Sequence, residues 1–255
     1  MKKLVIGNLK MNLLSSAERD VYLKGMDRVT AGKKFPDTTI VLCPPFVHIE
    51  GFKKWKNRKI ARGAQDVFFE SKGSYTGGIS PVMLKNFGCD YVIVGHSERR
   101  KYFSESNDVI NHKIIAALNH GLKPILCVGE TKDEKDSDST LAVITQQVTE
   151  ALVDVNRAKA NQIIIAYEPV WSVGSDVVPS SNEIMGAKLL IRKILHELFD
   201  KKHAEEVAIL YGGNVNVKTA KQVCIDSEVD GTLIGRDSLR PSEFIKIVKI
   251  INSSE

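Results

Sequence analysis

Short apolar segments, separated by longer mixed stretches, recur along the whole chain at intervals averaging roughly 32 residues, about the length of one βα unit. Most are continuous rather than alternating and are rich in Val, Ile and Leu. This pattern is typical of strands buried on both faces of a parallel sheet. Seven of these segments have a clear apolar pattern, whereas that of Ala61–Gln65 is weaker. The predicted strands are Leu4–Gly7, Thr39–Cys43, Ala61–Gln65, Tyr91–Gly95, Ile125–Val128, Ile163–Tyr167, Val207–Tyr211 and Thr232–Gly235.

Helical patterns fill the stretches between the predicted strands. Ser180 and Glu183 have the spacing of a capping box and precede an amphipathic stripe. Ser104 is the predicted cap of another helix, which we expect to stop at Gly121. An open doubly wound sheet also fits this alternation. Because eight units fill the chain without a break in composition, we predict one domain over 1–255, a closed (β/α)8 TIM barrel.

Composition and charge narrow the class of protein. The chain has 255 residues, a usual size for one such barrel, and a net charge of +5. This mild basic excess suits an anionic metabolite, although a solvated surface explains it equally well. The basic run Lys53–Lys59 contains no aromatic residue besides Trp55, so we interpret it as a solvated helix face and predict no nucleic-acid partner. Lys132–Asp138 is interpreted as a polar loop leading into a helix.

Cysteine usage and hydropathy predict where the protein works. The four cysteines are far apart, so we interpret them as buried thiols of a reducing compartment. Asn8 and Lys10 interrupt the first apolar run too early for a signal peptide. The chain also lacks an apolar run near the ~18 residues of a membrane span. We therefore predict a soluble cytoplasmic protein without a membrane partner.

Reactive side chains follow three of the predicted strands. Asn8 and Lys10 follow the first, His96 follows the fourth and Glu168 follows the sixth. Each alone has an ordinary structural explanation: a surface cation, a hydrogen-bonded core histidine or a turn cap. Their shared position at strand carboxyl ends favours a catalytic role over a structural one, because active sites of (β/α)8 barrels lie at that end.

The glycine-containing turns and the carboxylate at the strand ends suit a substrate that is a phosphorylated carbonyl compound. The sequences YGGN (211–214) and IGR (234–236) place glycine-containing turns before helices, where backbone N–H groups can bind phosphate. A carboxylate in a dry site can remove a proton beside a carbonyl, while neutral donors and a cation stabilise the enediolate. Glutamate rather than lysine at the sixth strand argues against a Schiff base. Metal-ligand spacing is missing, so we predict a reaction without a metal or cofactor.

Seven stretches, in order across almost the whole chain, resemble the triosephosphate isomerase family. They are GNLKMN (7–12), TGGISPVMLK (76–85), VGHSERRKYF (94–103), CVGE (127–130), AYEPVW (166–171), YGGNV (211–215) and DGTLIGR (230–236). The resemblance implies that Glu168 is the catalytic base and that His96 polarises the carbonyl. Lys10, helped by Asn8, would stabilise negative charge. A helix starting at Ser97 would favour a neutral His96 ring.

The same resemblance implies a phosphate site, a lid and a dimer. Phosphate would be bound by the N–H groups of Gly174, Asn214, Gly235 and Arg236. The apolar segment that starts at Pro169 would be a lid that excludes water. The long Gly-rich loop 66–80 would insert into a second subunit and bring Thr76 near that subunit's Lys10, which makes the expected assembly a homodimer.

Three departures from the family pattern surround the phosphate and the lid. The lid ends Gly174-Ser175-Asp176-Val177-Val178-Pro179 where G-T-G-K-T/S-A is common, Asn214 replaces a serine, and Arg236 replaces a glycine. We favour a backbone role for Arg236, with its side chain in solvent. The leading hypothesis is interconversion of dihydroxyacetone phosphate and glyceraldehyde 3-phosphate. The alternative is the same chemistry on the four-carbon L-erythrulose 1-phosphate, and a third possibility is a catalytically silent, phosphate-sensing barrel.

Overall fold

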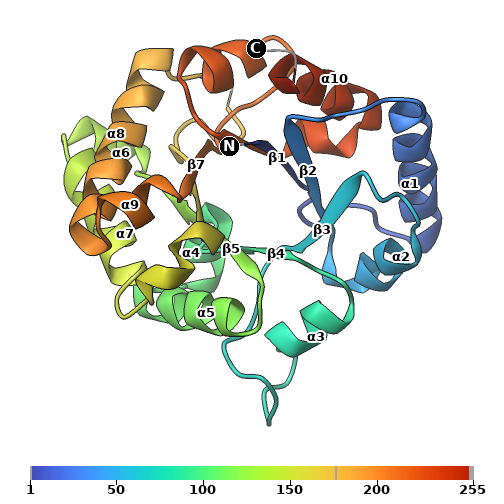
Figure 1. Cartoon of the computed structure of the whole chain (residues 1–255), viewed down its shortest axis with the longest axis horizontal. Coiled ribbons are helices and arrows are strands. Elements are labelled where there is room, and N and C mark those ends of the chain that lie inside the picture. The colour runs from blue at the N-terminus through green and yellow to red at the C-terminus, as the bar shows by residue number, and fades with distance from the viewer. Residues whose placement is uncertain (1, 176, 253–255) are drawn as a thin grey trace.

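The structure is a computed structural model that describes residues 2–175 and 177–252. Eight strands form a closed parallel barrel with helices around it, which confirms the predicted (β/α)8 fold (Figure 1). Each strand pairs with the next, and β8 closes on β1, with Leu4 opposite Gly231. The strands are β1 (Lys3–Asn8), β2 (Thr38–Cys43), β3 (Ile60–Ala64), β4 (Tyr91–Val94), β5 (Lys123–Val128), β6 (Ile164–Tyr167), β7 (Ala208–Tyr211) and β8 (Gly231–Ile234).

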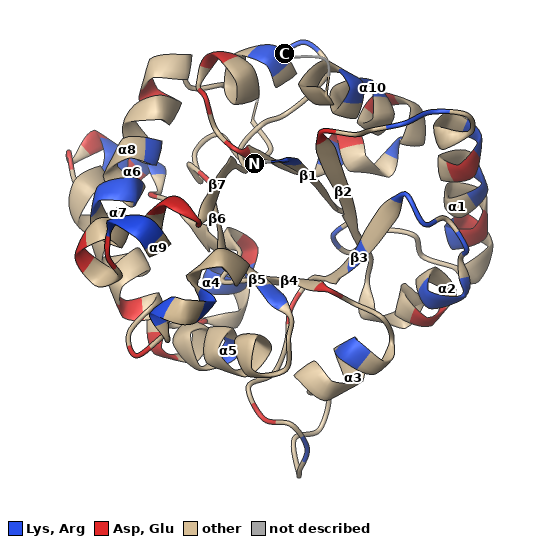
Figure 2. Ribbon diagram, viewed as in Figure 1, with Lys and Arg blue, Asp and Glu red and all other residues tan. Residues whose placement is uncertain are grey.

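The barrel interior is a packed apolar cluster that includes Ile6, Ile93, Ile125 and Leu210. A second, larger cluster fills the space between the strands and the helices. Both faces of each strand are therefore buried, which explains why the strands are continuous apolar runs in the sequence. Figure 2 shows the charged residues mainly on the outer helices and the connecting loops.

The helices that surround the barrel vary widely in length. They are α1 (Ser16–Thr30), α2 (Ile49–Lys54), α3 (Pro81–Asn86), α4 (Ser97–Phe103), α5 (Asn107–Asn119), α6 (Lys132–Asp136), α7 (Thr140–Ala151), α8 (Ser181–Leu198), α9 (Lys201–Glu205) and α10 (Pro241–Asn252). Within the described residues, no helix combines the length and the apolar character that crossing a membrane needs. All four cysteines are buried and free, as predicted.

Helix ends account for most of the differences from the sequence predictions. The capping box of Ser180 and Glu183 is present at the start of α8. The role predicted for Ser104 is wrong, because this residue ends α4 in a left-handed conformation (φ 53°) and Ser106 caps α5. Ser104 and Ser106 are both chemically suited to cap a helix. Because Ser104 ends the short helix α4, Ser106 is the residue that caps α5.

Two polar segments also differ from their predicted structures. The run 132–138 is not a loop: residues 132–136 form α6, which begins with a capping box made by Thr131 and Glu134. The predicted helix face 53–59 is helical only to Lys54. The chain turns at this point because the Trp55 indole donates to Asp27, and the Lys59 N–H donates to the Asn57 side chain.

The loop 66–80 projects away from the barrel between β3 and α3 (Figure 1). Its base is fixed by buried charges: Asp66 accepts from Lys113 at 2.7 Å and pairs with Arg99 at 3.0 Å. The Phe68 N–H donates to the Ile79 carbonyl at 2.8 Å and closes the loop. Thr76 lies exposed in the projecting part.

Candidate active site

A cavity of about 270 Å³ opens at the carboxyl ends of the strands. Its lining contains all eight residues that the sequence predicts for catalysis and phosphate binding: Asn8, Lys10, His96, Glu168, Gly174, Asn214, Gly235 and Arg236. Thr76 is not among the lining residues, as expected for a loop that extends away from its own barrel. The structure thus brings together groups that lie up to 228 residues apart in sequence, from Asn8 to Arg236.

Lys10 is held in an unusual backbone conformation. Its φ of 49° lies in the left-handed region, which a long side chain rarely adopts. Two hydrogen bonds fix it there: its N–H donates to Asn8 Oδ1 at 3.0 Å, and its carbonyl accepts from Gln65 Nε2 at 2.9 Å. The Lys10 ammonium contacts Glu98 Oε1 at 2.6 Å. Backbone strain of this kind is maintained by its surroundings and is common where a side chain must be aimed at a site.

His96 stands immediately before α4 and is only 5 % exposed. The backbone N–H of Glu98 donates to His96 Nδ1 at 3.2 Å, so Nδ1 is an acceptor without a proton. The ring is then neutral and carries its proton on Nε2. That Nε2 lies 3.3 Å from Glu168 Oε1. A neutral imidazole therefore presents an N–H donor to the cavity.

Glu168 follows β6 and is 2 % exposed. Its backbone N–H donates to the Val128 carbonyl at 2.7 Å, and its Oε2 accepts from the Ser97 N–H at 3.4 Å. Two glycines from neighbouring loops contact Glu168, one at its backbone and one at its side chain, and neither position has room for a Cβ. A Cβ at Gly129 would lie 2.0 Å from the Glu168 carbonyl oxygen, and a Cβ at Gly212 would lie 2.7 Å from Glu168 Cγ. The glycines thus leave room for a buried carboxylate in one defined position.

Two ionisable groups in the region of the site stay neutral. Burial, reinforced by the negative charge of Glu168, raises the pKa of the Cys127 thiol well above its usual value. Burial also raises the pKa of Tyr211 to about 12, although its hydrogen bond with Ser172 acts the other way. The thiol and the phenol therefore remain protonated at neutral pH, and they add no competing base to the site.

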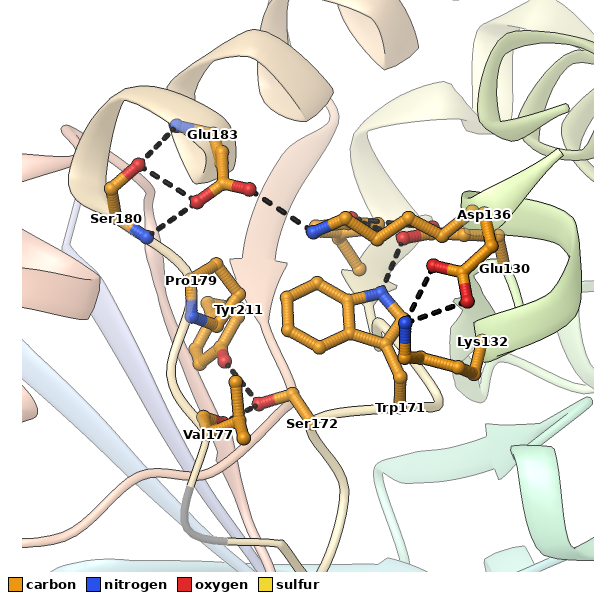
Figure 3. A network of polar contacts seen from close by, with 12 residues as sticks. Glu130, Lys132, Asp136, Trp171, Ser172, Val177, Pro179, Ser180, Glu183 and Tyr211 are labelled. Carbon is orange, nitrogen blue, oxygen red and sulfur yellow. Dashed lines mark hydrogen bonds and ion pairs between the residues drawn. The ribbon is translucent and has the colours of Figure 1, made fainter. Parts of the chain in front are cut away.

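The start of the lid is anchored by a polar network around Trp171 (Figure 3). The indole N–H donates to Glu130 Oε1 at 2.7 Å. The ammonium of Lys135, on α6, lies 3.6 Å from the centre of the Trp171 ring and 3.1 Å from Glu183 Oε1. Because Glu183 belongs to the capping box of α8, Lys135 connects both ends of the lid. Sequence reasoning missed Lys135, since its helix was interpreted as a loop.

Residues at the end of β7 and in the loops after β7 and β8 contact the tip of the lid. Ser172 Oγ donates to the Val177 carbonyl at 2.7 Å and lies 3.1 Å from the Tyr211 hydroxyl. Asn214 Nδ2 donates to the Ser175 carbonyl at 2.7 Å. Asp176, one of the departures from the family pattern, lies outside the described residues.

Arg236 also reaches the lid. Its Nη2 donates to the Gly174 carbonyl at 3.1 Å, although the residue is exposed. The side chain thus lies at the surface, as interpreted, but it also makes a contact with the lid that the sequence did not predict. The sequence could not reveal the contact, because it depends on where a separate loop is placed.

Comparison with known proteins identifies the family. Residues 3–251 match the family model described as triosephosphate isomerase. The chain belongs to the triosephosphate isomerase family. It is 43 % identical over 252 residues to the triosephosphate isomerase of Dictyoglomus thermophilum, covering 97 % of this chain and 99 % of that protein.

Two further relatives carry the same name. The triosephosphate isomerases of Dictyoglomus turgidum and Thermodesulfovibrio yellowstonii are each 41 % identical over 249 residues, with 97 % of this chain and 99 % of each relative covered. The protein is thus an isomerase of this family, which agrees with the resemblance of its sequence motifs. The likeness extends over the whole barrel and is not limited to the strand ends.

Proposed function

We propose that this triosephosphate isomerase family member interconverts dihydroxyacetone phosphate and D-glyceraldehyde 3-phosphate through an enediolate. The observation that supports this most is the meeting of a buried carboxylate, Glu168, with the neutral ring of His96 in a cavity that Lys10 also lines. A base beside a neutral hydrogen-bond donor and a cation suits proton transfer next to a carbonyl.

In the proposed reaction Glu168 removes a proton from C1 of the ketose. The C1–H electron pair forms the C1–C2 double bond, and the carbonyl electrons move to the oxygen on C2. The Nε2–H group of His96 and the ammonium of Lys10 stabilise that oxygen as its negative charge develops. The proton of the C1 hydroxyl then moves to the oxygen on C2, with His96 as its carrier. The electrons of the C1–C2 double bond take the proton back from Glu168 at C2, and the C1–O bond becomes the carbonyl of the aldehyde. Asn8 supports Lys10 through the hydrogen bond to its backbone.

The other end of the cavity suits the phosphate. Gly174, Asn214, Gly235 and Arg236 line this end, and in the proposal their backbone N–H groups bind the phosphate oxygens. The lid would exclude water while the enediolate exists. Its contacts with Asn214 and Arg236 bring it over this end of the cavity.

Turnover measurements on one purified sample test the substrate. We expect fast interconversion of the three-carbon phosphates and much slower turnover of L-erythrulose 1-phosphate. Glu168→Gln should lower kcat by about 10²- to 10⁴-fold, the usual contribution of a general base, while inorganic phosphate still binds. Faster turnover of the four-carbon sugar would contradict the proposed substrate. Phosphate binding by the unmodified protein without isomerisation would contradict the enzymatic proposal and favour a sensor.

We propose in addition that the protein is a homodimer, assembled through the loop 66–80. In support, this loop projects from the barrel (Figure 1), and an apolar groove of about 300 Å³ lies near its base. The groove is lined by Phe46, Val47, Ile49, Glu50, Ile79, Met83, Leu84 and Phe87. Met11 beside Lys10 is 89 % exposed, and an equivalent subunit could cover it. Thr76 of one subunit would approach Lys10 of the other.

The chemistry of the cysteines supports a location. Cys43, Cys89, Cys127 and Cys224 are buried free thiols. Thiols persist in reducing compartments. We therefore propose that the enzyme works in the cytoplasm.

A further inference from the structure

The phosphate end of the cavity contains a side chain whose charge has no role in the reaction described above. Arg236 opens the short helical turn Arg236–Leu239 after β8, and its guanidinium extends to the lid. It donates one hydrogen bond, from Nη2 to the Gly174 carbonyl at 3.1 Å. The guanidinium has five N–H donors in a planar fork, so this bond leaves donors available for a second partner.

The charges around the cavity suggest what that second partner is. The ammonium of Lys10 already contacts the Glu98 carboxylate at 2.6 Å, and Glu168 adds a negative charge. Arg236 differs from Lys10 because its lid partner is a neutral carbonyl. Its positive charge is therefore available to a ligand. A phosphate dianion suits it, because guanidinium forms strong and often bidentate hydrogen bonds with phosphate oxygens.

We propose that Arg236 is a positioning residue that binds the substrate phosphate and the lid carbonyl of Gly174 at the same time. This inference rests on the proposed function, because it assigns the phosphate group of the substrate to this end of the cavity. Bound phosphate would then fix the guanidinium against the Gly174 carbonyl and hold the lid down more firmly than Arg236 does alone. The neighbouring hydrogen bond from Asn214 to the Ser175 carbonyl would keep the adjacent peptide in place.

The test compares a substrate that carries phosphate with one that does not. Arg236→Gly should lower kcat/KM for glyceraldehyde 3-phosphate by about 10- to 100-fold, the usual effect of losing a hydrogen bond to a charged group. It should leave kcat/KM for phosphate-free glyceraldehyde within about twofold, because that substrate has no group for Arg236 to bind. Arg236→Lys should recover part of the loss by restoring the charge.

Lys218→Met is the matched control. Lys218 is an exposed cation in the loop after β7, and its replacement removes one positive charge without removing a lid contact of Arg236. We expect this variant to behave as the unmodified enzyme with both substrates. An equal fall for both substrates in Arg236→Gly would overturn the proposal, and so would a Lys variant as impaired as the Gly variant. Either result would leave Arg236 with a structural role alone.

A binding titration separates this inference from the proposed function. Inorganic phosphate is titrated by calorimetry into the unmodified protein and into Arg236→Gly, and no turnover is involved. We expect affinity to fall by about 10- to 100-fold in the variant. Equal affinities would overturn the role of Arg236 even in an active enzyme. Weakened phosphate binding with no isomerisation by the unmodified protein would support Arg236 and contradict the proposed function.

Discussion

At the residue scale, the position of the Glu168 carboxylate is set by the backbone around it. Gly212 allows the close approach, since a Cβ there would lie 2.7 Å from Glu168 Cγ and 3.3 Å from its Oε1. Real Cβ atoms do not tolerate the shorter distance, so one of the two groups would move. The proposed chemistry requires the carboxylate to reach two adjacent carbons, and a small displacement of it should affect rate more than folding.

Gly212→Ala should therefore lower kcat by about 100-fold, the loss expected from misplacing a reacting group by about 1 Å. Steady-state kinetics measures the rate, and thermal unfolding measures stability. Gly186→Ala is the control: Gly186 is an exposed residue inside α8, and a Cβ there meets nothing within 4 Å. It should leave kcat unchanged and stabilise the helix by about 0.5–1 kcal/mol. A normal kcat in Gly212→Ala would show that Glu168 is not constrained by this loop.

At the element scale, the short helix α6 connects the two ends of the lid. Lys135 contacts the Trp171 ring at the start of the lid and Glu183 just after its end. Cation–π contacts contribute about 0.5–2 kcal/mol, depending on their exposure to water. The five-residue helix is thus linked to lid position through a single side chain.

Lys135→Met should lower the free energy of unfolding by about 1 kcal/mol, because both contacts are lost. It should also shift the fluorescence of Trp171, which can be recorded alone in a Trp55→Phe background because the chain has two tryptophans. Lys132→Met is the control from the same helix, since Lys132 pairs with Asp136 at 2.5 Å. If both variants changed Trp171 fluorescence equally, the effect would belong to α6 as a whole.

The elements differ in how well the sequence predicts them. Strands such as β6 and β7 are recognisable because burial on both faces requires continuous apolar runs. The helix α6 is not, because five polar residues carry no apolar stripe, and a capping box and contacts with distant residues stabilise them. Ser104 and Ser106 show a similar limit: local chemistry suits both as caps, and only the fold decides between them.

At the scale of the whole molecule, barrel closure makes the site predictable from sequence. Once eight parallel strands close, their carboxyl ends form one rim, so Asn8, His96 and Glu168 must meet. The contact of Arg236 with Gly174 is different, because it depends on the position of the lid, which no local pattern encodes. The sequence thus predicts which residues line the cavity but not how the lid is bound.

The proposed dimer can be tested at this same scale. Val47→Glu places a charge in the apolar groove beside the projecting loop, at a side chain that is 81 % exposed in one chain. Burying an unpaired charge in an interface is strongly unfavourable, so the dissociation constant should rise by about 100-fold or more. Light scattering over a dilution series measures it. Leu189→Glu, on the exposed side of α8, should leave the assembly unchanged. A monomeric unmodified protein would contradict the dimer.

The central claim is that Glu168 carries a proton between adjacent carbons. Incubating dihydroxyacetone phosphate with the enzyme in deuterium oxide and recording proton NMR spectra tests it most directly. We expect the carboxyl group of Glu168 to exchange its proton with solvent in some turnovers, so that deuterium appears on the adjacent carbon of the product. The Glu168→Gln variant should lose both isomerisation and labelling by at least about 10²-fold. Undiminished labelling in that variant would contradict the claim.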